Sequence, residues 1–230
     1  MSHLHLSHIY NWLLMQYYYS QGKHQEVVDY CTKLISNTCE PVDTAVYYVQ
    51  RGREYCQLGQ YQRAVDDFDK FLSMDLGESV LKKIFGTTLY AISYAWRASA
   101  YHSLEQYQKA IDDYSKKINL TPKDAVSYQR RGTAYAWLVE YQKAVDDFNI
   151  AINLRPKYAL AYQRRGRAFA SLKEYQKAVD DCTTAININP KLTDAYVTRA
   201  TAYRWLQKLD LAANDDKVAE KLGYKPQQRK

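Results

Sequence analysis

The segment from Arg130 to Pro156, RRGTAYAWLVEYQKAVDDFNIAINLRP, decides the fold of this chain. The segment from Arg164 to Pro190, RRGRAFASLKEYQKAVDDCTTAININP, follows it and repeats it almost letter for letter. The shift between the two copies is about 34 residues and brings Gly132 onto Gly166. A fixed period of this length indicates an array of stacked structural units.

Each copy contains the pattern of two amphipathic helices joined by a short break. Tyr128, Gly132 and Tyr135 follow an i, i+4, i+7 spacing, which places them on one face of a first helix. A second apolar stripe follows the break, and Pro156 then ends the pair, because proline cannot continue a helix. The residues of this second stripe are Tyr141, Ala144, Phe148 and Ala151.

These small and aromatic positions resemble the motif of the tetratricopeptide repeat (TPR) family. That motif is an aromatic residue, a Gly or Ala and a Tyr, followed by a Tyr, an Ala, an aromatic residue, an Ala and a Pro. The resemblance covers His8 to Gly223 and implies an all-α fold, a right-handed α-solenoid of about six helix-turn-helix units. Two units match almost completely, through Tyr128, Gly132, Tyr135, Tyr141, Ala144, Phe148, Ala151 and Pro156, and through Tyr162, Gly166, Phe169, Tyr175, Ala178, Cys182, Ala185 and Pro190.

The spacing of the motif also predicts where the units begin and end. We expect a degenerate first repeat over residues 8–41, as is common at the end of a solenoid, where one face meets solvent. An insertion at residues 79–90 is predicted to form an extra or extended helix, which either covers a repeat edge or docks a partner. The other predicted units are 45–78, 91–124, 125–158, 159–192 and 193–224, followed by a basic tail at 225–230.

The composition is that of a globular protein with an unusual number of tyrosines. The chain is 47% hydrophobic and 25% charged, and its 23 tyrosines suit the half-buried seams between helices. A net charge of +7 favours acidic partners modestly and is also in the range that keeps a domain soluble.

The cysteines and the N-terminus bear on the compartment. Cys31, Cys39, Cys56 and Cys182 show no CxxC spacing and are interpreted as thiols in a reducing environment. The first residues lack a basic leader, a cleavage site and an uninterrupted apolar run. We therefore expect a cytoplasmic protein without a membrane span.

Arginine and aspartate recur together in the repeats. In five units an arginine falls on the inward stripe of the first helix, and an aspartate flanks the packed stripe of the second, whereas the first repeat lacks both. A buried arginine needs a partner, so we predict structural ion pairs, within a repeat or between neighbours. Adjacent aspartates such as Asp146 and Asp147 point about 100° apart on a helix and cannot chelate one metal ion; Asp146 is expected in water near Lys143. The predicted partners are Arg51 and Asp67, Arg97 and Asp113, Arg131 and Asp147, Arg165 and Asp181, and Arg199 and Asp215.

The resemblance implies that the first helices line a concave groove. Arginines gather there in the C-terminal half with tryptophans beside them, a combination that suits an extended acidic or C-terminal peptide. The lysine and asparagine positions with which some family members clamp a chaperone tail are incomplete here, and the asparagine ladder of others is missing. The predicted peptide-binding residues are Arg130, Trp137, Arg164, Arg167, Arg204, Gln129, Gln163 and Trp205.

The sequence favours a protein-binding scaffold or adaptor over other classes of function. No phosphate-binding glycine loop, HExxH motif or nucleophile with a placed base is present, so we expect no enzyme, no cofactor and no metal site; His3, His5 and His8 have mixed spacing. Single-stranded nucleic acid is an alternative ligand for the basic aromatic groove. A further alternative is an assembly subunit, including a homo-oligomer, that acts through the insertion and the open C-terminal end.

Overall fold

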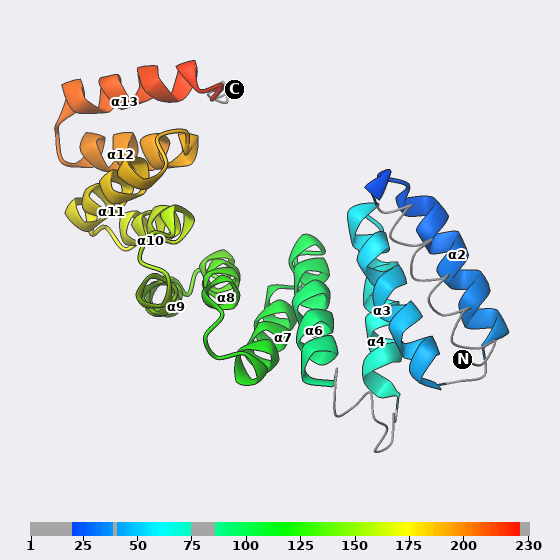
Figure 1. The fold of residues 1–230 in the computed structure, drawn as a ribbon. Coiled ribbons are helices and arrows are strands. Elements are labelled where there is room, and N and C mark those ends of the chain that lie inside the picture. Colours follow the sequence, from blue (N-terminus) through cyan, green and yellow to red (C-terminus); the bar gives the residue numbers. More distant parts are fainter. Residues whose placement is uncertain (1–19, 39–40, 75–85, 226–230) are drawn as a thin grey trace. The chain divides into compact units, whose positions relative to one another are not determined.

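The computed structural model describes residues 20–38, 41–74 and 86–225, in which eleven helices and no strands are present. The chain divides into two compact units, one ending at Leu120 and the other beginning at Thr121. In the first unit (Figure 1) the helices are α2 (His24–Asn37), α3 (Pro41–Gln57), α4 (Tyr61–Ser73), α6 (Gly86–Ser103) and α7 (Tyr107–Leu120). In the second they are α8 (Ala125–Trp137), α9 (Tyr141–Leu154), α10 (Ala159–Ser171), α11 (Tyr175–Ile188), α12 (Thr193–Trp205) and α13 (Leu209–Lys221).

The break inside each repeat is a tight turn with one residue in the left-handed region. In the repeat that opens the second unit this residue is Val139, with φ of 64°, between the end of α8 and the start of α9. The Glu140 N–H donates to the Tyr135 carbonyl at 3.0 Å, which satisfies a carbonyl at the end of α8. The helix boundaries at Trp137 and Tyr141 agree with the break predicted from the sequence.

Small residues let the two helices of a repeat approach closely. A Cβ added at Gly132 would lie 2.9 Å from Cε1 of Phe148 and 3.1 Å from the Ala144 carbonyl oxygen. A Cβ added at Gly166 would lie 2.9 Å from Sγ of Cys182. The helices are therefore packed against bare backbone at these glycines, which explains the small residue in the motif.

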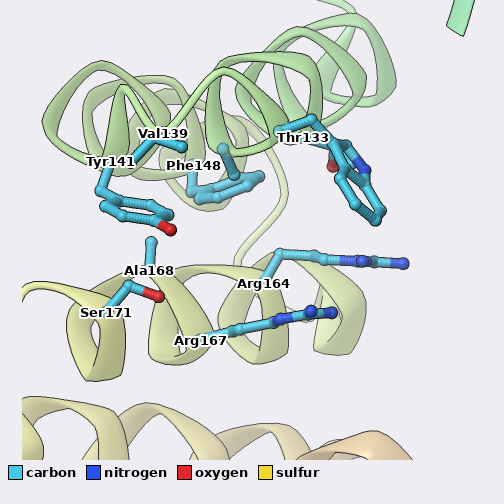
Figure 2. A pocket seen from close by; sticks show the side chains of 10 residues that line it. Thr133, Val139, Tyr141, Phe148, Arg164, Arg167, Ala168 and Ser171 are labelled. Atoms are coloured by element: carbon cyan, nitrogen blue, oxygen red, sulfur yellow. The ribbon is translucent and has the colours of Figure 1, made fainter. Parts of the chain in front are cut away.

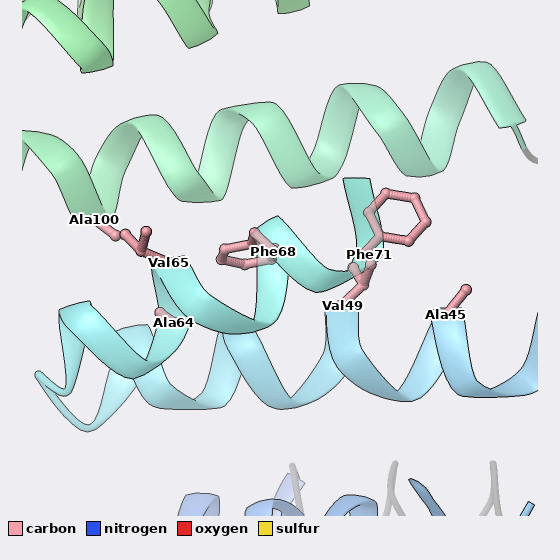
Figure 3. Packing of buried hydrophobic residues seen from close by; sticks show 7 residues of the cluster. All are labelled: Ala45, Val49, Ala64, Val65, Phe68, Phe71 and Ala100. Carbon is pink, nitrogen blue, oxygen red and sulfur yellow. The ribbon is translucent and has the colours of Figure 1, made fainter. Parts of the chain in front are cut away.

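The first unit has a core built from α3, α4 and α6. Figure 3 shows its buried members, among them Val49, Phe68 and Phe71. Phe71 is fully buried at the position where the repeats of the second unit have alanine, and its ring packs on Tyr90 with centroids 5.1 Å apart. Tyr90 belongs to the N-terminal extension of α6, which begins at Gly86. The predicted insertion thus forms an extended helix over residues 86–90, while residues 79–85 lie outside the described part of the chain.

The structure bears on the membrane and metal predictions within its described residues. No helix there is long and apolar enough to cross a bilayer. No group of three or more His, Cys, Asp or Glu side chains is placed there to hold a metal ion. His3, His5 and His8 lie outside the described residues.

Three cysteines are free thiols inside the helical packing, and burial raises the pKa of Cys31, Cys56 and Cys182 to about 12 in each case. The thiolate is the reactive form, so native protein in a Cys39→Ser background should resist iodoacetamide at pH 8. At intermediate urea concentrations, Cys182 should become reactive when the second unit unfolds, and Cys31 should become reactive when the first unit unfolds. Mass spectrometry of alkylated peptides checks this, and rapid labelling of Cys31 or Cys182 without denaturant would contradict the packing described.

Candidate functional site

The recurrent arginines and aspartates form bidentate ion pairs within each repeat. Nε and one terminal nitrogen of Arg131 donate to the two carboxylate oxygens of Asp147, both at 2.8 Å. The same fork joins Arg51 to Asp67, Arg97 to Asp113, Arg165 to Asp181 and Arg199 to Asp215, with N–O distances from 2.6 to 2.8 Å. The hydrogen bonds to Asp147 raise the pKa of Arg131 above its usual value. All five aspartates are buried, so the pairs belong to the interior.

The remaining nitrogen of several guanidinium groups reaches the preceding repeat. Arg165 donates to Oδ1 of Asn149 at 2.6 Å, and Arg199 donates to Oγ1 of Thr183 at 2.9 Å. Arg51 donates in the same way to Thr32, and Arg97 to Asp69. The arginine therefore joins the two helices of its own repeat and also the second helix of the repeat before it.

The first aspartate of each pair faces solvent, but its partner differs from the sequence-based expectation. Asp146 accepts a hydrogen bond from Gln142 at 3.1 Å, one helical turn earlier. Lys143, which we expected near this carboxylate, pairs with Glu140 at 2.5 Å. The i, i+4 spacing places Gln142 above Asp146, whereas Lys143 reaches back toward the N-terminus of α9.

Two cavities flank α10 in the second unit. The first, of about 250 Å³, lies between α8, α9 and α10, and Figure 2 shows side chains that line it. The second, of about 440 Å³, lies between α10 and α12, and Tyr224 is also among its lining residues. Arg167 and Ser171 line both cavities, so the exposed face of α10 connects them.

Two arginines on α10 form a concentration of positive charge at the first cavity. Arg164 and Arg167 extend from the helix side by side (Figure 2). Burial lowers the pKa of Arg164, and the charge of Arg167 lowers it further, while Asp194 acts in the opposite sense. Neither arginine forms an ion pair with any described residue, and the buried Nε of Arg164 has no hydrogen-bond partner among them. Their charge is available to an anionic group.

A buried glutamine adds unused hydrogen-bonding capacity beside the second cavity. Gln129 on α8 donates to Thr133 at 2.9 Å and accepts from the Tyr158 hydroxyl at 3.2 Å. Gln163, the same position one repeat later, is 1% exposed, yet neither of its amide atoms has a partner within the described residues. The positions equivalent to Thr133 and Tyr158 are Arg167 and Leu192, and the structure has no hydrogen bond from either to Gln163.

The predicted peptide-binding residues fall into two groups. Trp137, Gln163, Arg164 and Arg167 line the cavities around α10. The other four do not line these cavities. Gln129 is buried and hydrogen-bonded to Thr133, and Arg130 is exposed on α8. Arg204 pairs with Asp216, and Trp205 stacks on Tyr175. Sequence reasoning missed Val139, Tyr141, Asp194 and Tyr224 as lining residues, because it assigned the first two to a turn and to packing.

The first unit holds a polar network that the sequence did not predict. Glu54 is fully buried, where later first helices have alanine. Its carboxylate contacts Nδ1 of His24 at 2.7 Å and accepts from Gln50 at 2.8 Å. Arg53 donates to Gln50 at 3.2 Å and lies over the Trp96 ring, 5.6 Å from its centroid. This network joins α2, α3 and α6.

Comparisons with known proteins identify the repeat. A family model described as tetratricopeptide repeat matches residues 159–192, and a second model of that description matches residues 45–77 and 91–124. No curated protein sequence matches the chain. Among solved structures, a crystal structure of MamA is 24% identical with a TM-score of 0.62, and the match covers 74% of this chain and 93% of that one.

Two other solved structures are similar. YrrB, described as a TPR protein with an unusual peptide-binding site, is 18% identical with a TM-score of 0.61 and coverage of 84% and 92%. The first TPR of Spaghetti (RPAP3), bound to the HSP90 peptide SRMEEVD, is 27% identical with a TM-score of 0.50 and coverage of 51% and 94%. The repeated motif, the paired helices and these matches together show that the chain is a tetratricopeptide repeat protein.

Proposed function

We propose that this chain is a protein-interaction scaffold that binds an extended acidic peptide segment across α10. The observation that carries the proposal is the pair Arg164 and Arg167, whose charges face a cavity without a carboxylate partner among the described residues. Burial first, and the neighbouring charge of Arg167 second, lower the pKa of Arg164, and a bound carboxylate would offset both effects. Arginine forks also bind carboxylates in a bidentate, charge-assisted manner.

The glutamine beside them supports a peptide rather than a small anion. An orphaned buried amide is costly, and Gln163 retains both a donor and an acceptor at the second cavity. A peptide main chain presents a carbonyl and an N–H in the complementary arrangement. In this proposal the partner's main chain contacts Gln163 while its acidic side chain contacts Arg164 and Arg167.

The similar structures are consistent with a peptide ligand. The RPAP3 repeat is bound to the peptide SRMEEVD, which contains acidic residues, and YrrB is described as having a peptide-binding site. Repeats of this family are generally non-catalytic interaction modules. The groove of this chain is proposed to act in the same general way, with α10 as its centre.

Charge reversal on α10 tests the proposal. Fluorescein-labelled acidic decapeptides, and versions with Gln and Asn in place of Glu and Asp, are titrated with wild type and with the Arg164→Glu, Arg167→Glu double variant. We expect the double variant to bind the acidic peptides at least about tenfold more weakly, a loss of about 1.4 kcal/mol or more. The neutral peptides should bind poorly to both proteins, and the melting temperature should not fall.

The matched control is Lys157→Glu, Lys191→Glu, which makes the same charge change at exposed positions outside both cavities. An equal loss in this control would show that net charge alone attracts the peptides and would overturn the site. Single-stranded RNA is included as a competitor. Binding of RNA without binding of any acidic peptide would replace the proposed ligand with nucleic acid.

A further inference from the structure

We propose that the first cavity takes one large apolar side chain of the partner, tryptophan or phenylalanine above all, next to the acidic residue held by Arg164 and Arg167. This inference rests on the proposed function, because it concerns the same peptide at the same site. It adds a recognition element that charge alone does not supply.

Two equivalent junctions within the second unit are filled differently. Where α11 meets α12, the Trp205 ring stacks on Tyr175 with centroids 5.4 Å apart and an interplanar angle of 6°. Where α9 meets α10, Tyr141 takes the place of Tyr175, but Ser171 stands where Trp205 would be. Figure 2 shows Tyr141 opposite Ala168 and Ser171, and all three line the cavity. The chain fills one junction with its own indole and leaves the equivalent place open in the other.

The dimensions and walls of the cavity fit one side chain. Its volume of about 250 Å³ lies below the roughly 300 Å³ at which pockets for drug-sized ligands begin. Tyr141, Phe148 and Ala168 supply aromatic and aliphatic walls, and aromatic rings attract one another in offset stacked or edge-on geometry. A ring entering from outside would meet Tyr141 as Trp205 meets Tyr175.

The rim of the cavity carries a residue that the turn itself does not favour. Val139 is β-branched, has φ of 64° and is 67% exposed, whereas the equivalent turn positions are held by Gly59, Glu105, Lys173 and Gln207. A left-handed conformation is costly for a β-branched side chain, so its presence is not explained by the turn. It does add an apolar side chain to the lining of the cavity, which also includes the half-exposed Trp137.

The charge around the cavity determines what accompanies the apolar side chain. Arg164 and Arg167 line the same cavity as Tyr141. A peptide with an apolar side chain in this cavity would therefore hold its adjacent residues close to the two guanidinium groups. An acidic residue adjacent in the peptide satisfies their charge. The ligand class is therefore a peptide segment with an aromatic residue beside Asp or Glu.

Peptides that differ at one residue test this inference. Fluorescein-labelled decapeptides of one acidic sequence carry Trp, Phe or Ala beside the Glu, and they are titrated against wild type, Ser171→Ala and Ser171→Trp. Wild type and Ser171→Ala, which leave the cavity open, should bind the Trp peptide about tenfold more tightly than the Ala peptide. Ser171→Trp should fill the cavity from within, abolish this preference and keep the weaker charge-dependent binding. Ser36→Trp, on the exposed face of α2, controls for the added indole.

A second variant separates a role of Val139 in binding from a role in stability. Val139→Gly removes the rim side chain and relieves the backbone, so it should raise the melting temperature and still reduce the preference for the Trp peptide. If wild type binds the Trp and Ala peptides equally while binding still depends on Arg164 and Arg167, the inference fails and the proposed function stands. If the dependence on the arginines is absent as well, both fail.

Discussion

Replacing Arg165 with alanine is expected to lower the free energy of unfolding by about 3–5 kcal/mol, the cost of leaving one member of a buried ion pair alone. Asp181 would then remain in the interior without the two hydrogen bonds at 2.7 Å that Arg165 now donates. The substitution also removes the bond to Asn149 and so weakens the contact with the preceding repeat. In a stacked array a weakened junction destabilises both neighbours.

Asn149→Ala is the matched control, because it removes only the bond between repeats. Its expected cost is about 1 kcal/mol, the net value of one hydrogen bond. Urea denaturation followed by circular dichroism gives both values. The same measurement on Asp181→Ala and on the double Arg165→Ala, Asp181→Ala variant should show that the double variant loses less stability than the sum of the Arg165→Ala and Asp181→Ala losses. Equal losses for Arg165→Ala and Asn149→Ala would show that the fork to Asp181 contributes little to stability.

The sequence predicts the helices and the ion-pair partners well, for physical reasons that act locally. Tyr128, Gly132 and Tyr135 lie on one helical face whatever surrounds them, and the break before Tyr141 follows from the end of that pattern. Arg131 and Asp147 could be matched because such residues occur together in one unit after another. Whether the pair lies within a repeat depends on how the two helices cross, which spacing along the chain does not determine. The structure shows that the fork is internal and that several of the same guanidinium groups also reach the preceding repeat.

The candidate site is harder to predict, because it depends on what neighbouring repeats leave open. Arg164, Arg167 and Trp137 were predicted from their helical face, and the cavities gather them with Gln163. Arg204 on α12 was also predicted to face the groove, but it forms an ion pair with Asp216 on α13. The first cavity is open because the small Ser171 stands where the next repeat has Trp205. Only an alignment of the two repeats that compares Ser171 with Trp205 would have revealed it.

The contact between His24 on α2 and Glu54 on α3 suggests the second large effect on stability. At later junctions the equivalent residues are Tyr and Ala, as in Tyr61 with Ala100, Tyr141 with Ala168 and Tyr175 with Ala202. His24 and Glu54 replace them where α2 meets α3. Burial of a carboxylate is costly even when it is paired, so exchanging such a pair for well-packed apolar residues is often neutral or stabilising.

We expect His24→Tyr alone to cost about 3 kcal/mol, because Glu54 would stay fully buried against a ring without its imidazole partner. Glu54→Ala alone should cost about 1 kcal/mol, since His24 is partly exposed and can turn to water. The double variant restores the tyrosine–alanine junction and should unfold at the wild-type urea concentration or above it. Denaturation of all four proteins by urea closes the cycle, with Gln50→Ala, which removes one bond to Glu54, as the control. Additive losses of about 4 kcal/mol in the double variant would show that the two positions do not share one packing site and that the His24–Glu54 contact is not what holds α2 against α3.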